Sequence, residues 1–150
     1  MTPEEKCELA IERGYTYDTE TGLIYNRFKK QPITNRDNGY IRFQLRLNKK
    51  PYNIRGHQFA WYYVNKQCVE EIDHINGIRY DNRICNLRSV THQQNHWNRT
   101  KAKGYHWHKK HQKYAAQIRI NKKAIHLGLF NTEQEAQNAY LKAKEIYHKF

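Results

Sequence analysis

The sequence has few of the residues that build disulfide frameworks. It contains only three cysteines in 150 residues, and these are Cys7, Cys68 and Cys85. They are odd in number, far apart and never arranged as CxxC, which excludes a cysteine-based zinc knuckle. We interpret them as the reduced thiols of a cytosolic protein.

Long hydrophobic runs are also missing. The longest, FAWYYV at residues 59–64, is far shorter than the roughly 20 apolar residues that a membrane helix needs. The N-terminus shows no charged region followed by an apolar one, so we expect no signal peptide. We therefore expect a cytoplasmic protein that does not associate with a membrane.

Negative charge and apolar residues are scarce. The chain has 14 Asp and Glu against 27 Lys and Arg, which gives a net charge of +13 and a pI near 9.7. Only 38% of its residues are hydrophobic and the mean hydropathy is −1.10, which favours two thin modules over one thick core. The positive charges are interleaved with 12 Tyr and 3 Trp. This pattern favours a nucleic-acid partner over mere solubility.

The N-terminal part predicts a helix and a hairpin. Residues 2–14 should form a short helix, with Thr2 as N-cap and Glu5 closing a capping box. Residues 39–47 alternate as a strand that pairs with residues 51–56. Ile41, Phe43, Leu45 and Leu47 would face the core, and Tyr40, Arg42, Gln44 and Arg46 would face out. The basic outer face, with Arg42 and Arg46, is either a DNA-facing ribbon or a solvated sheet face.

Residues 57–66 are too aromatic for an exposed loop and predict a buried helix, in which His57 is a hydrogen-bonded structural residue. Residues 99–104 have no apolar content apart from an alanine and read as a linker. Three short strands and a helix should follow. Thr132 and Glu135 would cap this helix, and its apolar stripe would comprise Ala136, Ala139, Tyr140, Ala143, Ile146 and Tyr147.

The segment EIDHINGIRYDNRICNLRSVTHQQN, residues 71–95, carries the strongest chemical signal. In an extended strand, the adjacent Asp73 and His74 point to opposite sides and can take different tasks. A carboxylate suits Mg²⁺ or Mn²⁺, and a histidine suits a general base near neutral pH. A polar loop, the strand LRSV and a helix capped by Thr91 and Gln94 follow, with Asn95 in the first turn able to face Asp73.

This segment resembles the HNH endonucleases with a ββα-metal site, in the form found in phage and group I intron homing endonucleases. The resemblance covers about residues 15–100. It implies that Asp73 and Asn95 bind one divalent ion and that His74 is the general base. It also implies that Asn86, in CNLR, holds the loop and the base in geometry.

The letters that name the family are His-Asn-His, and this chain has Asp at the first metal position and Asn at the last. Oxygen ligands shift the expected ion from zinc toward Mg²⁺ or Mn²⁺. His92 and His96 lie four residues apart and are alternative ligands, although surface histidines on a DNA-facing helix are the favoured interpretation.

The C-terminal segment resembles the AP2 DNA-binding domain through KYAAQIR, through IHLGLFNTEQEAQNAY and through its order of three strands and a helix. We discount a metal site at His106, His108 and His111, and we expect Trp107 in the core. The resemblance and the basic surroundings place these residues at the DNA: Lys103, His106, His108, Lys110, Gln117, Arg119, Lys122 and His126.

Together these features predict an α+β protein with two domains. Residues 1–100 would form the nuclease region, with a ββα-metal core at about residues 57–98, and residues 101–150 an AP2-like domain. We expect a site-specific endonuclease that nicks double-stranded DNA as a monomer, in the host cytoplasm if it is phage-encoded. The alternative is a non-catalytic AP2-type DNA-binding regulator. An RNA-binding or RNA-cleaving protein is favoured by no feature.

Overall fold

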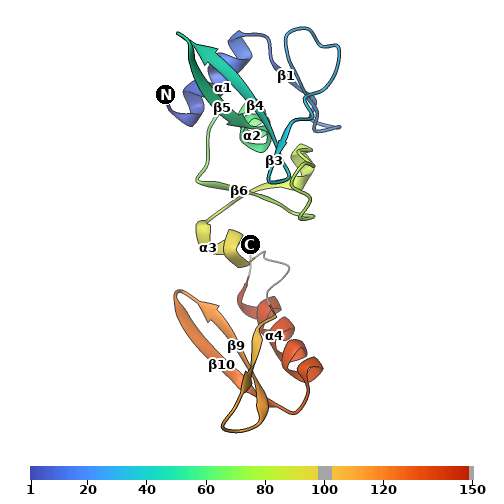
Figure 1. The fold of residues 1–150 in the computed structure, drawn as a ribbon, viewed down its shortest axis with the longest axis vertical. Coiled ribbons are helices and arrows are strands. Elements are labelled where there is room, and N and C mark those ends of the chain that lie inside the picture. Colours follow the sequence, from blue (N-terminus) through green and yellow to red (C-terminus); the bar gives the residue numbers. More distant parts are fainter. Residues whose placement is uncertain (98–102, 149–150) are drawn as a thin grey trace. The chain divides into compact units, whose positions relative to one another are not determined.

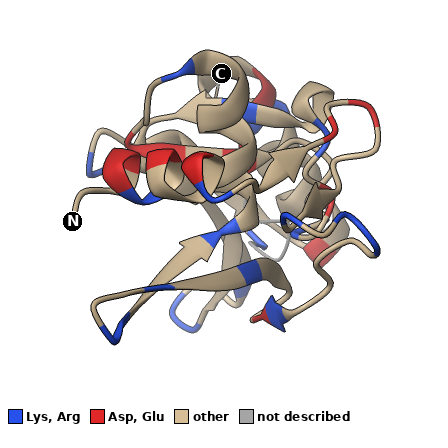
Figure 2. Cartoon of the chain, turned by 90° about the horizontal axis from the view of Figure 1, so that it is seen from above, with Lys and Arg blue, Asp and Glu red and all other residues tan. Residues whose placement is uncertain are grey.

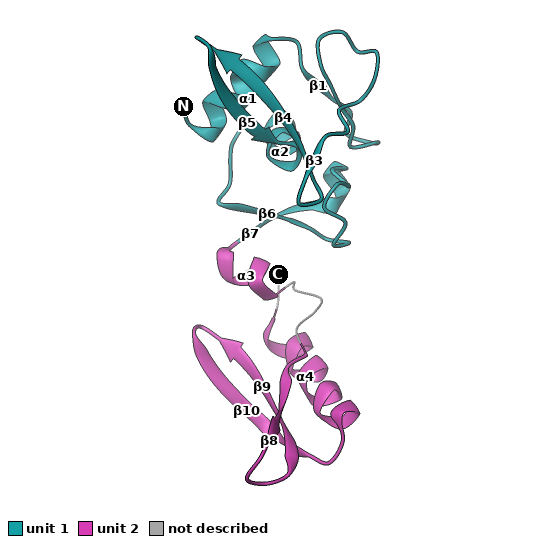
Figure 3. Ribbon diagram, in the orientation of Figure 1, with its two compact units in different colours: residues 1–90 teal, residues 91–150 magenta. Residues whose placement is uncertain are grey.

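The computed structural model describes residues 1–97 and 103–148 and shows a mixed α/β chain (Figure 1). The chain divides into two compact units, residues 1–90 and 91–150 (Figure 3), which are described separately below. Most of the expected linker, residues 99–104, lies outside the described residues. No helix in the described ranges is both long and apolar enough to cross a membrane.

Unit 1 begins with helix α1 (Pro3–Glu12), and its start is the capping box that the sequence predicts. The Thr2 hydroxyl accepts a hydrogen bond from the backbone N–H of Glu5 at 3.2 Å, and the Glu5 carboxylate accepts from the backbone N–H of Thr2 at 2.7 Å. The helix ends before Gly14, whose φ of +82° is a conformation that glycine adopts without strain. Local chemistry therefore fixes both ends of α1.

The next strands form two small sheets. Strands β1 (Thr16–Tyr17) and β2 (Ile24–Tyr25) pair with each other. Strands β3 (Arg36–Asp37), β4 (Tyr40–Leu47) and β5 (Lys50–Arg55) form an antiparallel sheet in that order. The short β3 is not predicted by the sequence.

The alternation that we predict along β4 is confirmed at its centre. Phe43 and Leu45 are buried, whereas Arg42, Gln44 and Arg46 are exposed. Asn48 and Lys49 have φ values of +50° and +64°, which suits the tight turn of a two-residue hairpin. The hairpin therefore has one face on the core and one basic face in solvent.

Helix α2 (Gly56–Asn65) supplies the centre of the unit 1 core. Phe59 is fully buried, and its ring packs edge-on against Phe43 at 5.4 Å. Tyr15 stacks on the other side of Phe43 at 5.0 Å. The aromatic segment is thus the buried helix that its composition predicts.

A second hairpin completes unit 1. Strand β6 (Glu71–His74) pairs antiparallel with β7 (Leu87–Val90), and the short 3₁₀ helix η1 (Ile84–Asn86) lies just before β7. The register places Asp73 opposite Arg88 and His74 opposite Leu87. Asp73 and His74 therefore lie on β6, which is paired with β7. A long polar loop connects the two strands.

Unit 2 contains helix α3 (His92–Trp97), a sheet and a final helix. Strands β8 (Tyr105–His108), β9 (Lys113–Ile120) and β10 (Lys123–Phe130) form an antiparallel sheet in the order β10-β9-β8. Helix α4 (Glu133–Tyr147) packs on it, with Ile118, Tyr140 and Ala143 forming a small core. The order of three strands and a helix matches the sequence expectation, while the AP2 likeness remains a prediction.

Two expectations about burial in unit 2 are wrong. Trp107 is 49% exposed: its ring packs edge-on against Tyr114, its cross-strand partner, at 4.9 Å, but β8 is the edge strand and leaves the ring half in solvent. Ile146 and Tyr147 are 62% and 44% exposed. They lie in the last turn of α4, whereas the buried stripe consists of Ala136, Tyr140 and Ala143. The apolar stripe of α4 therefore extends beyond the part of the helix that packs on the sheet.

Candidate active site

Strand β6 presents Asp73 and His74 as a buried pair. Asp73 is 6% exposed and His74 is 5% exposed. Because side chains alternate along a strand, the two neighbours reach different surroundings. The structure gives each a different partner, Arg88 for the carboxylate and Asn82 for the imidazole.

Arg88 neutralises Asp73 across the hairpin. Its Nε and Nη2 atoms lie 2.8 Å and 2.7 Å from the same carboxylate oxygen, Oδ2. The Asp73 side chain is 7% exposed and that of Arg88 is 27% exposed, so the pair is largely shielded from water. A buried carboxylate needs such compensation, because an isolated charge is costly in the interior.

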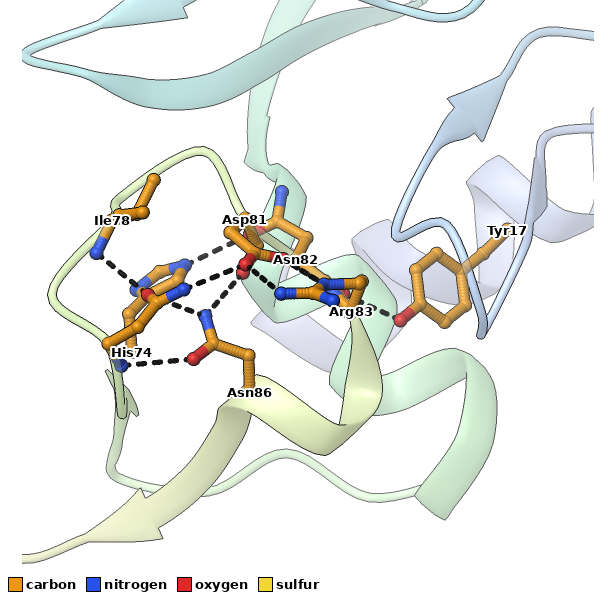
Figure 4. A network of polar contacts seen from close by, with 8 residues as sticks. Tyr17, His74, Ile78, Asp81, Asn82, Arg83 and Asn86 are labelled. Carbon is orange, nitrogen blue, oxygen red and sulfur yellow. Dashed lines mark hydrogen bonds and ion pairs between the residues drawn. The ribbon is translucent and has the colours of Figure 1, made fainter.

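Asn82 fixes the imidazole of His74. Its Oδ1 atom lies 3.0 Å from His74 Nε2 (Figure 4). Since an amide oxygen only accepts, Nε2 must carry the hydrogen, and Nδ1 is then the basic nitrogen of the neutral ring. Asn82 is not among the site residues that the sequence predicts, although it lies in the Asp-Asn-Arg triplet of the loop.

Asn82 is itself held firmly. Its side chain is fully buried, and its backbone carbonyl accepts a 2.6 Å hydrogen bond from the Tyr17 hydroxyl. Its Nδ2 atom lies so close to Gly56 that a Cβ there would approach it to 2.7 Å. Burial raises the pKa of Tyr17, so this phenol remains a donor. The partner of His74 therefore has little freedom to move.

Asn86 holds the loop between β6 and β7 rather than the imidazole. Its Oδ1 accepts from the backbone N–H of Asn76 at 3.0 Å, and its Nδ2 donates to Asn76 Oδ1 at 3.0 Å and to the Asp81 carbonyl at 2.8 Å. Figure 4 shows these bonds crossing the loop. Of the two tasks that we assigned to Asn86, the structure shows the loop contacts, and the contact to His74 comes from Asn82.

Asp81 strengthens the same loop through Arg83. The two side chains meet at 2.7 Å and 2.8 Å, and Asn76 Nδ2 donates to Asp81 at 2.8 Å. The hydrogen bonds from Arg83, followed by that from Asn76, lower the pKa of Asp81 to about 2. A carboxyl with a lowered pKa stabilises the fold above its ordinary pKa and loses that contribution as pH falls toward about 2. Asp81 is therefore ionised, and able to pair with Arg83, throughout the neutral range.

His57 forms the inner wall behind His74. The two rings lie 5.3 Å apart, edge to face, and the ring of Tyr40 packs near both, at 5.2 Å and 5.8 Å. Burial, followed by electrostatic interaction with His74 and with Arg55, lowers the pKa of His57 to about 3, so the ring of His57 is neutral at physiological pH. Its buried Nδ1 has no hydrogen-bond partner among the described residues.

Asp73 is the expected cation ligand of the site. No group of three or more His, Cys, Asp or Glu side chains in the described ranges is arranged to hold a metal ion. Asp73 offers carboxylate oxygen, and Mg²⁺ keeps several waters and needs few protein ligands. Asn95, the expected second ligand, lies on α3 in unit 2, so its pairing with Asp73 remains a prediction.

Helix α3 starts at the capping box that the sequence predicts. The Thr91 hydroxyl accepts from the backbone N–H of Gln94 at 3.2 Å, and the Gln94 side chain accepts from the N–H of Thr91 at 2.9 Å. Asn95 therefore lies in the first turns of a capped helix. His92 and His96, the alternative ligands, are exposed on the same helix.

The sheet of unit 2 brings together most of the residues that we expect at DNA. His106 pairs with Ala115, and His126 pairs with Gln117, so these residues share one face with Arg119. His108 follows His106 two positions on and lies on that face too. A hollow in unit 2 lies beside this face, and its lining includes His92, His96, Trp97, Gln117, Arg119 and His148.

The other expected DNA contacts lie at the edges. Lys110 and Lys122 occupy the turns beside β9, and Lys103 precedes β8. In unit 1, Arg42 and Arg46 are exposed on β4, and Arg42 forms an ion pair with Asp37 at 3.5 Å. Contact of any of these residues with DNA remains a prediction.

Comparison with known proteins adds a family to this geometry. No curated protein matches the chain. The solved structure of DNA binding and cleavage by the HNH homing endonuclease I-HmuI is similar over 56% of this chain, with a TM-score of 0.46 and 25% identity, and the chain spans half of that chain's length. The model of a family described as HNH endonuclease matches residues 56–97, the segment from α2 to α3 that holds Asp73, His74, Asn82 and Asn86. Residues 56–97 are therefore similar to the HNH endonucleases.

Proposed function

We propose that the chain is a divalent-metal-dependent DNA endonuclease in which His74 is the general base. The observation that carries this proposal is the buried His74, whose Nε2 is bound by Asn82, beside Asp73 in the segment that matches HNH endonucleases. An imidazole whose Nε2 is held by a hydrogen bond can use its Nδ1 to accept a proton from water.

In the proposed mechanism, His74 Nδ1 removes a proton from the water that attacks the phosphorus. Asn82 keeps the ring in the required tautomer, and Asn86 and Asp81 keep the loop around it closed. Asp73 and Asn95 would hold Mg²⁺ or Mn²⁺, and the ion would supply positive charge to stabilise the phosphate oxygens. His57 supports the ring of His74 as a neutral wall.

The rest of the chain would hold the DNA. The shared face of His106, Gln117, Arg119 and His126 is suited to double-stranded DNA, as the AP2 resemblance implies, and the net charge of +13 provides sequence-independent attraction. A single Asp73–His74 pair serves one phosphate at a time. We therefore propose a monomer that nicks one strand, in the manner of a homing endonuclease in the host cytoplasm.

The direct test measures the conversion of supercoiled plasmid into open-circle and linear products. The plasmid carries a target sequence selected from a random DNA library. With Mg²⁺ or Mn²⁺ we expect open-circle product first and linear product late, and a chelator should abolish both. DNA that is bound but uncut with each ion would favour a non-catalytic regulator. Linear and open-circle products that form equally early, with second-order dependence on the enzyme, would show a dimer.

The role of Asn82 can be tested apart from the metal. Asn82→Leu removes the acceptor at nearly constant volume and should lower the cleavage rate by about tenfold to a hundredfold, the usual loss for a residue that orients a catalytic group. At neutral pH, ¹⁵N NMR of the imidazole should show the Nε2–H form of His74 in the parent and a mixture of tautomers in Asn82→Leu. Asn82→Asp keeps an acceptor and should keep the Nε2–H form. An unchanged tautomer in Asn82→Leu would refute this role.

A further inference from the structure

Three arginines of unit 1 lie on tyrosine rings, and one of these rings, Tyr40, is close to His74. The Cζ atoms of Arg55 and Arg79 each lie 5.3 Å from the centroid of the Tyr40 ring. Arg36 lies 4.0 Å from the centroid of the Tyr80 ring. These five side chains come from β3, β4, β5 and the loop after β6, and we call them the Arg–Tyr surface.

The arginines of this surface are held in place without being neutralised. None of Arg36, Arg55 and Arg79 forms an ion pair with a carboxylate in the described part of the chain. Arg79 Nη1 donates to the backbone carbonyl of Asn38 at 3.0 Å, a contact that orients it but leaves its charge. All three arginines are exposed. Oriented guanidinium groups without a counter-ion suit the planar, bidentate recognition of phosphate.

The strand register places two like charges opposite each other, and a bound anion would offset their repulsion. Arg42 and Arg55 lie directly opposite each other on β4 and β5, and like charges in that position destabilise a sheet. Arg42 has Asp37 as a partner, whereas Arg55 lies over the Tyr40 ring and forms no ion pair with any residue that the structure describes. Figure 2 shows basic residues marking the β4–β5 hairpin, while acidic residues gather on helix α1. A polyanion on the hairpin side would relieve this repulsion.

The position of Tyr40 connects this surface to the chemistry. Its ring lies 5.8 Å from that of His74 and 5.3 Å from each of Arg55 and Arg79. Tyr40 is thus in contact both with the proposed general base and with the two guanidinium groups. A strand whose scissile phosphate lies at His74 would bring its neighbouring phosphates to the surface around Tyr40.

We propose that the Arg–Tyr surface binds the DNA backbone at the phosphates next to the one that is cut. This assignment rests on the proposed nuclease function for the identity of the cut phosphate, but the binding itself does not require cleavage. Tyr40 acts as a common platform that keeps Arg55 and Arg79 apart and aligned, and Arg36 extends the surface along Tyr80. The surface reads the position of the backbone and no base sequence.

The test measures binding in a His74→Ala background without metal, so that cleavage does not interfere. The probe is a fluorescent 30-base-pair duplex of mixed sequence, titrated over a range of salt concentrations. Each lost phosphate contact should lower the slope of log K against log salt by about 0.9, so Arg55→Gln with Arg79→Gln should lower it by about 1.8. The matched control is Arg27→Gln, because Arg27 lies over Phe28 at 4.7 Å with the same chemistry but outside this surface.

The variants with lysine, Arg55→Lys and Arg79→Lys, should keep the salt slope but weaken binding, because charge remains and the bidentate geometry is lost. A slope for the double glutamine variant that equals that of Arg27→Gln would overturn the proposal. With His74 restored, the double variant should also lose cleavage efficiency more than Arg27→Gln does. If the parent never cleaves DNA yet the slope falls as expected, the nuclease proposal fails and the surface stands.

Discussion

Replacing His74 with alanine is expected to abolish cleavage while DNA affinity stays close to that of the parent. General-base catalysis contributes about 10²–10⁴-fold, so the cleavage rate should fall by that factor. A buried imidazole bound to Asn82 adds little to phosphate affinity. Single-turnover cleavage and fluorescence anisotropy on the same DNA would separate the two quantities.

Two controls test whether the loss of cleavage is specific to the imidazole of His74. His111→Ala removes an exposed histidine of unit 2 and should change neither quantity. Added imidazole should restore part of the activity of His74→Ala, because the substitution opens space at the position of the lost ring. Near-parental turnover of His74→Ala without added imidazole would remove His74 from the mechanism.

Replacing Asp73 with alanine is expected to have the second-largest effect. A metal-held phosphate is worth several kcal/mol in the transition state, which corresponds to about 10²–10³-fold in rate. The half-maximal concentration of Mg²⁺ or Mn²⁺ should rise as well, since the only charged ligand is lost. Asn95→Ala should do the same to a smaller extent, because an amide oxygen carries no charge.

The alternative ligands give the decisive comparison. His92→Ala and His96→Ala alter exposed residues of α3 and should leave the metal response unchanged. If these two variants shift the metal response while Asp73→Ala does not, the ligand set is wrong. Isothermal titration of Mn²⁺ into each variant would give the same answer without DNA cleavage.

The candidate site is predictable from the sequence where spacing alone determines the geometry. Asp73 and His74 are adjacent in a strand, so their divergence follows from the backbone. Asn86 lies in the turn before the partner strand, and its contact with Asn76 is of the kind that such loops favour. The Asn82 contact depends on how the whole loop folds back over eight residues, and on a glycine at position 56 that makes room for the amide. No local pattern encodes that approach.

The fold shows the same division between local and tertiary determinants. Thr2 and Thr91 cap their helices through hydrogen bonds to residues only three positions away, so both helix starts are predictable from the sequence. The exposure of Trp107 depends on the position of β8 at an edge of the sheet. The exposure of Ile146 depends on where α4 stops packing on the sheet. Those are properties of packing partners far away in the sequence, which hydrophobic periodicity does not report.

The pairing of Arg88 with Asp73 has a consequence for how the proposed ion would bind. Because the guanidinium already supplies a counter-charge, the buried carboxylate is compensated without a metal ion, unlike in small domains whose folding energy is their metal-binding energy. Binding of a divalent ion at Oδ2 would then be an exchange reaction, in which the ion takes the place of the Arg88 guanidinium. The apparent affinity for the ion would be the difference between these two attractions, and so lower than that of an unpaired carboxylate.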